Sequence, residues 1–344
     1  MQISIVIPIY NGANYIEDLY QSLKNQTYDD FEVIYINDGS KDNSLKLLSE
    51  IARNDSRVSV YSQENKGICA SRNLGIEKSH GEYLIFLDQD DGIENNLIEK
   101  YLEAITINDA DLASFGKMHY FVENGQIVSK KPQIIGEELV TDENQRLRYL
   151  FNIDNKKRLM TIWNCIYRKN IIEYHHIRFD QHFKHGDEDG MFNIEYTLHC
   201  KKVFFSKNCY YHYYIRKGIS TITKYNEELL ENYLYYADKV YSLITFYDDE
   251  IQNVVKLYLL RFFSNVYRRF CKFETNYNER VLFLEKTKKS RGFDFATSLK
   301  VMANFKIIPA KYLYWDLFNT CYKKNMFGTA IALLELLLTA KKIS

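Results

Sequence analysis

The sequence predicts an α/β fold in which a mostly parallel sheet, flanked by helices, is followed by an α-helical C-terminal region. Short apolar runs rich in β-branched and aromatic residues, typical of buried strands, alternate with segments whose apolar residues recur at helical spacing. This alternation predicts parallel strands joined by right-handed crossovers. Beyond residue 226 only helical patterns remain. We therefore expect two parts, residues 1–225 and residues 226–344.

The expected elements follow one another closely along the chain. Strands are expected over residues 3–9, 31–36, 58–61, 83–87 and 112–120, with a hairpin or surface excursion over 123–140 and an aromatic strand from residue 210. Helices are expected over about 15–23, 45–52, 68–79, 227–246, 250–273 and 279–288.

Length and composition narrow the class of protein. The 344 residues are 46% hydrophobic, which is enough for a sizeable core. There is no run of 18 apolar residues and no basic-then-apolar leader, so we expect neither a transmembrane helix nor a signal peptide. The six cysteines are scattered and form no CxxC pair, which favours reduced thiols in a cytoplasmic protein over a disulfide framework or a zinc site.

The net charge of zero conceals an uneven distribution. Residues 1–250 hold 28 Lys and Arg against 39 Asp and Glu, whereas residues 251–344 hold 17 against 6. The C-terminal region is therefore expected to meet something anionic, and because no nucleic-acid motif is visible, a membrane surface is favoured. The alternatives are that the two halves attract each other, or that the helices pack on the first domain or on another subunit.

The most informative stretch is the apolar strand at 83–87, which ends in Asp88, Asp90 and Asp91. Carboxylates crowded past the end of a strand repel one another, and a hard divalent cation such as Mg²⁺ or Mn²⁺ explains them most simply. Ligands of open α/β sheets also bind outside the carboxyl ends of strands. A loop with a helix cap is the alternative.

Asp38 and Arg72 lie in comparable places. Asp38 follows another expected strand, where it could accept hydrogen bonds from a base or a ribose, or serve only as a turn residue before Gly39. Arg72 lies in the first turns of a helix, which suits a phosphate, although an exposed ion pair is the alternative.

Six motifs occur in order along the first 110 residues: Ile7-Pro8-Ile9-Tyr10-Asn11, Asn37-Asp38-Gly39-Ser40, Asn65-Lys66-Gly67, Ala70-Ser71-Arg72-Asn73-Leu74-Gly75, Gly81-Glu82-Tyr83 and Phe86-Leu87-Asp88-Gln89-Asp90-Asp91. Together they resemble the nucleotide-sugar half of an inverting family 2 glycosyltransferase with the GT-A fold. Each motif is weak by itself, but their order and spacing are specific. The resemblance implies that Pro8, Tyr10 and Asp38 hold the uracil or ribose, that Asn65, Gly67 and Arg72 border the nucleotide, and that Asp90 binds Mn²⁺ or Mg²⁺ directly with Asp88 nearer the ribose.

A second acidic cluster spans residues 185–192. Inversion at an anomeric carbon needs one base to take the proton of the acceptor hydroxyl. The resemblance places that base in a Glu-Asp pair that opens a helix, here Glu188 and Asp189. Asp189 is the candidate base, with Glu188 orienting it or the acceptor and Asp187 as the competitor. Acidic enrichment in the first turn of an ordinary helix is the alternative.

The aromatic segment 210–220 resembles the closing motif of the family. Arg216 or Lys217 would reach the diphosphate, and Ser220 would cap it. His212 is a candidate metal ligand, although a structural role is favoured. Trp163 could stack on a sugar, but a buried core Trp is favoured, and Cys165 stands where the family often has Lys.

The resemblance implies a metal-dependent inverting glycosyltransferase. It would transfer a sugar from a nucleotide diphosphate donor, favoured to be a UDP-sugar, to a hydroxyl of a glycan or lipid-linked acceptor in cell-surface polysaccharide synthesis such as capsule, at the inner face of the membrane. The sequence does not decide between a monomer and an oligomer, and no nucleic-acid partner is expected. The alternative is a catalytically silent nucleotide- or glycan-binding protein of the same fold. A sugar nucleotidylyltransferase is disfavoured because residues 7–12 are not a Gly-rich loop.

Overall fold

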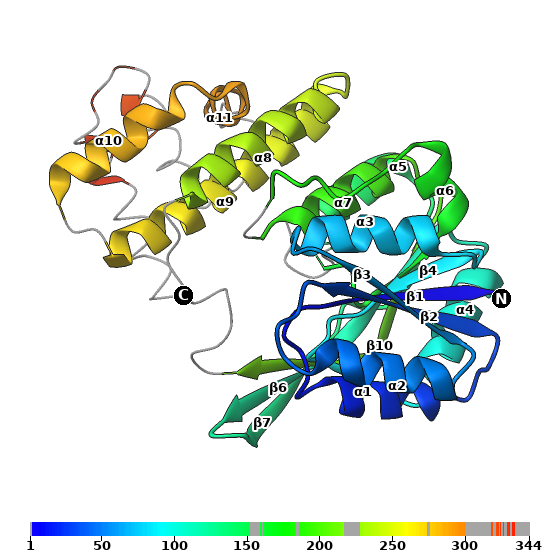
Figure 1. Cartoon of the computed structure of the whole chain (residues 1–344). Helices are drawn as coiled ribbons and strands as arrows, with labels where there is room; N and C mark the ends of the chain where they lie inside the picture. The colour runs from blue at the N-terminus through cyan, green and yellow to red at the C-terminus, as the bar shows by residue number, and fades with distance from the viewer. Residues whose placement is uncertain are drawn as a thin grey trace. The chain divides into compact units, whose positions relative to one another are not determined.

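The structure is a computed structural model. It describes residues 2–151, 159, 161–183, 186–216, 228–273, 276–299, 318, 321–322, 324, 326, 329–330 and 332–333. The chain divides into two compact units, Met1–Thr223 and Lys224–Ser344, and each is described by itself. The first unit is a mixed α/β unit and the described part of the second is helical, so the predicted fold class is confirmed (Figure 1).

The first unit is built on one sheet with the strand order β3-β2-β1-β4-β9-β6-β10-β5. Its first half is parallel, as predicted, and consists of β3 (Val58–Gln63), β2 (Phe31–Asp38), β1 (Ile3–Ile9) and β4 (Tyr83–Phe86).

The second half of the sheet is mixed, because β9 (Cys165–Arg168) runs antiparallel to both of its neighbours, β4 and β6 (Leu112–Glu123). β10 (Val203–Arg216) is parallel to β6. β7 (Gln126–Gln133) forms a hairpin with β6, while β5 (Gly92–Ile93) and β8 (Glu138–Val140) pair antiparallel with β10.

Helices cover both faces of this sheet. In Figure 1, α1 (Ile16–Lys24) and α2 (Ser44–Asn54) lie on one face, and α3 (Ile68–Lys78) and α7 (Glu188–Leu198) lie on the other. The remaining helices of the unit are α4 (Leu97–Ile107), α5 (Glu143–Leu150) and α6 (Lys169–Tyr174). Every residue of β1, β2 and β4 is buried, which explains why these strands read as nearly continuous apolar runs.

Close packing places α3 directly against the sheet. A Cβ atom on Gly75 would lie 2.2 Å from Cγ1 of Val6, a separation that van der Waals contact does not allow. Glycine at this position therefore lets the middle of α3 touch β1. The N-terminal half of α3, which carries Arg72, is thereby held near the carboxyl ends of the strands.

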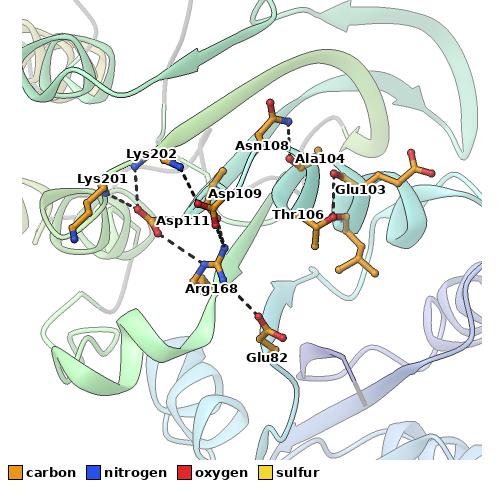
Figure 2. A network of polar contacts seen from close by, with 12 residues as sticks. Glu82, Glu103, Ala104, Thr106, Asn108, Asp109, Asp111, Arg168, Lys201 and Lys202 are labelled. Atoms are coloured by element: carbon orange, nitrogen blue, oxygen red, sulfur yellow. Dashed lines mark hydrogen bonds and ion pairs between the residues drawn. The ribbon is translucent and has the colours of Figure 1, made fainter.

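A polar network lies at the amino ends of β4, β6 and β10 (Figure 2). Asp111 accepts hydrogen bonds from the backbone N–H groups of Lys201, at 2.6 Å, and Lys202, at 3.0 Å. The guanidinium of Arg168 reaches Asp109 at 3.4 Å. The network fixes the ends of β9 and β10 against β6, so that the opposite ends of these strands are held at the other edge of the sheet.

The second unit is helical over its described residues. Its elements are α8 (Leu229–Ile244), α9 (Asp249–Phe273), α10 (Tyr277–Thr287) and α11 (Arg291–Thr297). Aromatic side chains from three of these helices meet in the core, where Phe263 lies 5.5 Å from Tyr233 and 4.6 Å from Phe293 between ring centroids. Within the described residues of the whole chain, no helix combines the length and the apolar character needed to span a bilayer.

Candidate active site

The candidate site lies at the carboxyl ends of the parallel strands. The register pairs Ile9 of β1 with Asn37 of β2, and β4 runs parallel on the other side of β1. The loops that follow Ile9 and Asp38 therefore leave the same edge of the sheet as the turn that begins at Asp88. This is the edge at which open α/β sheets bind their ligands.

Asp38 is almost fully buried and shapes the loop beside it. Its carboxylate accepts hydrogen bonds from the side chain of Gln63 at 2.7 Å and from the backbone N–H groups of Lys66 at 2.9 Å and Gly67 at 2.8 Å. Gly67 has φ +87°, in the left-handed region that favours glycine. Asp38 thus holds the loop that carries Asn65 and Gly67, and its predicted contact with the base or ribose stays a prediction.

Gln89 links the first loop to the acidic turn. Its side-chain carbonyl accepts the backbone N–H of Tyr10 at 2.9 Å, and its amide donates to the carbonyl of Tyr10 at 3.2 Å. The Tyr10 side chain is 45% exposed, whereas Pro8 is buried within β1. Tyr10 is therefore available to a ligand at this edge, and the predicted contact of Pro8 with the base or ribose stays a prediction.

The three aspartates of the acidic turn differ in their surroundings. Asp91 is buried and accepts the hydroxyl of Tyr211 at 2.8 Å and the backbone N–H of Tyr214 at 2.9 Å. Burial, together with the charges of Asp88 and Asp90, raises the pKa of Asp91 well above its ordinary value. Asp91 therefore fastens the turn to β10, and the other two carboxylates remain partly exposed.

Asp88 and Asp90 expose 29% and 41% of their side chains. Burial, followed by the charge of Asp88, raises the pKa of Asp90, while Arg216 opposes this by bonding the Asp90 carboxylate at 2.8 Å and its carbonyl at 2.7 Å. Two neighbouring hard oxygen donors fit a divalent ion. Among the described residues, no group of three or more His, Cys, Asp or Glu side chains is arranged to hold a metal. An ion here would therefore need further oxygens from the ligand and water.

Arg72 connects the acidic turn to the second acidic cluster. One of its terminal nitrogens donates to Asp189 at 2.8 Å and to Glu188 at 3.0 Å, and the other donates to Asp88 at 3.1 Å. The side chain is only 4% exposed, and its guanidinium lies 5.2 Å from the ring centroid of Phe179. The structure thus brings together the candidate base, its neighbour and one carboxylate of the acidic turn.

Asp189 lies at the start of α7, with 18% of its side chain exposed. Burial raises its pKa to about 7; the Arg72 charge opposes this shift, and the charges of Glu188 and Asp88 add to it. A carboxylate with this pKa can exchange a proton with a hydroxyl group near neutral pH. The helix is preceded by Asp187 at φ +72° and Gly186 at φ +113°, so the chain turns sharply into the site.

Other residues singled out in the sequence have structural surroundings. Trp163 is buried and stacks on Tyr211 with ring centroids 4.4 Å apart, which agrees with the favoured interpretation of a core Trp. His212 pairs with Glu94 at 2.8 Å, and among the residues described it belongs to no group of three or more His, Cys, Asp or Glu side chains that could hold a metal. Ser220, Lys217 and His185 lie outside the described residues.

Three residues that shape the site were not singled out by sequence reasoning. Gln89 bridges two loops, Tyr211 supports the acidic turn, and Asn73 exchanges two 2.8 Å hydrogen bonds with the backbone of Phe179. Gln89 and Asn73 lie inside the motifs quoted above, and this position could have marked them as site residues. The contact between Tyr211 and Asp91 had no local signal, because 120 residues separate them.

Comparison with known proteins identifies the family. The pattern described as "Glycosyl transferase family 2" matches residues 4–175, half of the chain. The chain belongs to glycosyl transferase family 2. This confirms the resemblance found in the sequence.

Relatives of this family 2 member include bacterial proteins. It is 32% identical to EpsH of Bacillus subtilis (strain 168) over 232 residues, which are 67% of this chain and 65% of that protein. It is 30% identical to the teichoic acid poly(glycerol phosphate) polymerase of Staphylococcus epidermidis over 203 residues, 58% of this chain and 26% of that protein. The matches thus span less than two thirds of each relative.

A solved structure shares the fold. The structure of S. aureus TarS 1–349 in complex with UDP-GlcNAc aligns with a TM-score of 0.74, covering 99% of this chain and 92% of that one. The identity is 20%, so this likeness concerns the fold.

Proposed function

We propose that this family 2 member is a metal-dependent inverting glycosyltransferase that uses a nucleotide diphosphate sugar. The observation that carries the proposal is the cluster around Arg72. It places Asp189, whose pKa is raised to about 7, one guanidinium away from Asp88 of the acidic turn. The proposed base for the acceptor and a proposed donor-side carboxylate are thus held by the same guanidinium.

Asp189 would act as the base. The acceptor hydroxyl gives its proton to the Asp189 carboxylate while its oxygen forms a bond to the anomeric carbon. The bond from that carbon to the diphosphate oxygen breaks, and the electron pair leaves with the nucleoside diphosphate. Attack from the face opposite the leaving group inverts the configuration. Glu188 shares the Arg72 nitrogen with Asp189, so it would hold the base in place.

Asp88 and Asp90 would hold Mn²⁺ or Mg²⁺ together with diphosphate oxygens. A bound divalent ion stabilises negative charge that develops on a leaving diphosphate. Arg216 lies against Asp90 and would supply a second positive charge to the same oxygens. The loop shaped by Asp38 would border the nucleoside together with Tyr10.

The donor is proposed to be a UDP-sugar. The motif resemblance supports uracil, and a protein of the same fold has been solved with UDP-GlcNAc. The acceptor is proposed to be a hydroxyl of a glycan or a lipid-linked glycan of the cell surface. The name of the Staphylococcus epidermidis relative supports this process. Family resemblance alone names no sugar, because function depends on the individual site.

The proposed location is the cytoplasmic face of the membrane. Support comes from the excess of positive charge in residues 251–344. The exposed Lys286 of α10 and the exposed Lys288 and Lys289 after it contribute to that charge. Replacing all three by Gln in the full chain should weaken binding to phosphatidylglycerol vesicles and leave the weaker binding to phosphatidylcholine vesicles unchanged. Equal sedimentation of both proteins would refute this role, and light scattering of the same samples would show whether the unit contacts another subunit.

A catalytically silent nucleotide-binding protein is the second candidate. One observation favours it: Asp88 and Asp90 each have an arginine partner, which a metal-free binder would also show. Such a protein would bind UDP without Mn²⁺ and would release nothing.

The test is release of UDP from a panel of UDP-sugars, with and without Mn²⁺ or Mg²⁺. Wild type should turn over one of them in the presence of metal. Asp90→Ala should lose the metal requirement and most activity, and Asp189→Asn should keep UDP binding but lose transfer to an added acceptor. Metal-independent UDP binding with no release by wild type would favour the silent candidate.

A further inference from the structure

Arg72 is the most enclosed charged side chain of the candidate site. It belongs to α3, and it contacts Asp88, which follows β4, and Glu188 and Asp189, which begin α7. Glu188 and Asp189 are each more than 110 residues away from Arg72 along the chain. One guanidinium therefore joins the acidic turn after β4 to the start of α7, which carries the candidate base.

Among the described residues, the hydrogen-bond partners of the Arg72 guanidinium are all carboxylates. Nη1 donates to Glu188 and Asp189 and Nη2 donates to Asp88, while the buried Nε has no hydrogen-bond partner in that part of the chain. The guanidinium also lies over Phe179, whose ring closes one side of it. A side chain enclosed in this way is committed to the carboxylates, and a phosphate would have to displace one of them.

We propose that Arg72 is a positioning residue that holds the base against the donor side of the site, rather than a ligand of the nucleotide. This rests on the proposed function, since it takes Asp189 as the base. Three carboxylates face one cation, so without Arg72 their mutual repulsion would drive α7 away from the acidic turn.

Arginine suits this role because its planar fork presents separate N–H groups in fixed directions. Lysine keeps the charge but offers a single nitrogen. It cannot replace the two terminal nitrogens with which Arg72 bonds Asp189 and Asp88 separately. α3 also supplies Asn73, which fixes the backbone of Phe179 with two hydrogen bonds of 2.8 Å. Consecutive residues of α3 thus hold both the base and the segment that leads to it.

The test compares Arg72→Gln and Arg72→Lys with wild type in the full chain. Arg72→Gln should lower kcat about 100-fold, because a small misplacement of a reacting group has effects of that size. The donor KM and the Kd of UDP should change less than about twofold. Arg72→Lys should recover part of kcat, since it keeps the charge that the cluster needs. Arg57→Gln is the matched control, because Arg57 is a half-buried arginine paired with Asp55 at 2.8 Å outside the site.

The outcomes separate the two roles of Arg72. A Kd for UDP that weakens tenfold or more in both variants, with kcat unchanged at saturating donor, would make Arg72 a nucleotide ligand and overturn the inference. Wild-type kcat in Arg72→Gln would also overturn it. If Asp189→Asn retains transfer, the base assignment is wrong and the inference falls with it. Thermal unfolding of each variant, compared with Arg57→Gln, shows whether a lost kcat reflects the site or the fold.

Discussion

Replacing Asp189 by Asn should stabilise the protein at alkaline pH while it removes transfer. The reason is burial, which raises the pKa of Asp189 to about 7 even though Arg72 opposes the shift. A carboxyl group whose pKa is higher in the folded state favours folding below its unfolded pKa, and this contribution is lost as the pH rises toward 7. Above pH 7 the folded protein carries a charge that its surroundings disfavour, and Asn removes that charge.

The size of the effect follows from the pKa. A tenfold change in proton affinity corresponds to about 1.4 kcal/mol, so the difference between an ordinary Asp and a pKa of about 7 sets an upper value on the order of 4 kcal/mol. The side chain is 18% exposed, so solvent screens part of this. Loss of the 2.8 Å bond to Arg72 reduces the gain further. We expect a gain on the order of 1 to 3 kcal/mol at pH 9.

The assay is denaturant unfolding of wild type and Asp189→Asn at pH 5, 7 and 9. The gain should be small at pH 5 and should grow up to about pH 7, because in this interval the unfolded Asp189 ionises while the folded one keeps its proton; above pH 7 it should level off. Asp180→Asn serves as a control, because it removes an acid outside the Arg72 cluster. Equal stability of Asp189→Asn and wild type at every pH would refute the reasoning, and so would a variant that is less stable at pH 9.

Three further predictions concern the same unit. Transfer by wild type at saturating substrate should rise with pH up to about 7 and fall about tenfold for each pH unit below it, because only ionised Asp189 accepts the proton; a flat profile from pH 5 to 8 would contradict this. Asp90→Asn should weaken the dependence of UDP binding on Mn²⁺ about tenfold or more, measured by calorimetry, and an unchanged dependence would exclude Asp90 as a ligand. Gly75→Ala should lower stability by about 1 to 3 kcal/mol, because its Cβ would overlap the side chain of Val6; thermal unfolding checks this, and an unchanged midpoint would mean that α3 can shift.

The parallel half of the fold could be predicted from the sequence because its signals are local. β1 was expected over residues 3–9 and is observed as Ile3–Ile9, and α3 was expected over 68–79 and is observed as Ile68–Lys78. This strand and this helix are each bounded by turn residues that are visible in the sequence. A local signal also singled out Asp88 at the end of an expected strand, whereas Asp189 was singled out by the family resemblance; the roles of both stay predictions.

The mixed half could not be predicted in the same way. β9 is only Cys165–Arg168, and it is inserted between β4 and β6. Its antiparallel direction depends on pairing with strands that are far away in sequence. A short apolar run predicts a buried strand but does not predict whether that strand is parallel or antiparallel to its neighbours. The segment just before β9 also matters for the site, because its Trp163 stacks on Tyr211 of β10, the residue that supports the acidic turn.

The role of Arg72 shows where sequence reasoning meets its limit. A helix start with an arginine is a reasonable phosphate site, and the family resemblance points the same way. The structure instead surrounds the guanidinium with the carboxylates of Asp88, Glu188 and Asp189. No spacing in the sequence predicts these contacts, because Asp88 comes before β9 along the chain and the other two carboxylates come after it. A cation that lies between two acidic clusters lowers their repulsion most when both are close, so under the proposed roles the charge that stabilises this arrangement would also set the distance between Asp189 and the donor. Stability and catalysis would then be coupled through one side chain, and substitutions at residue 72 should affect kcat more than they affect nucleotide affinity.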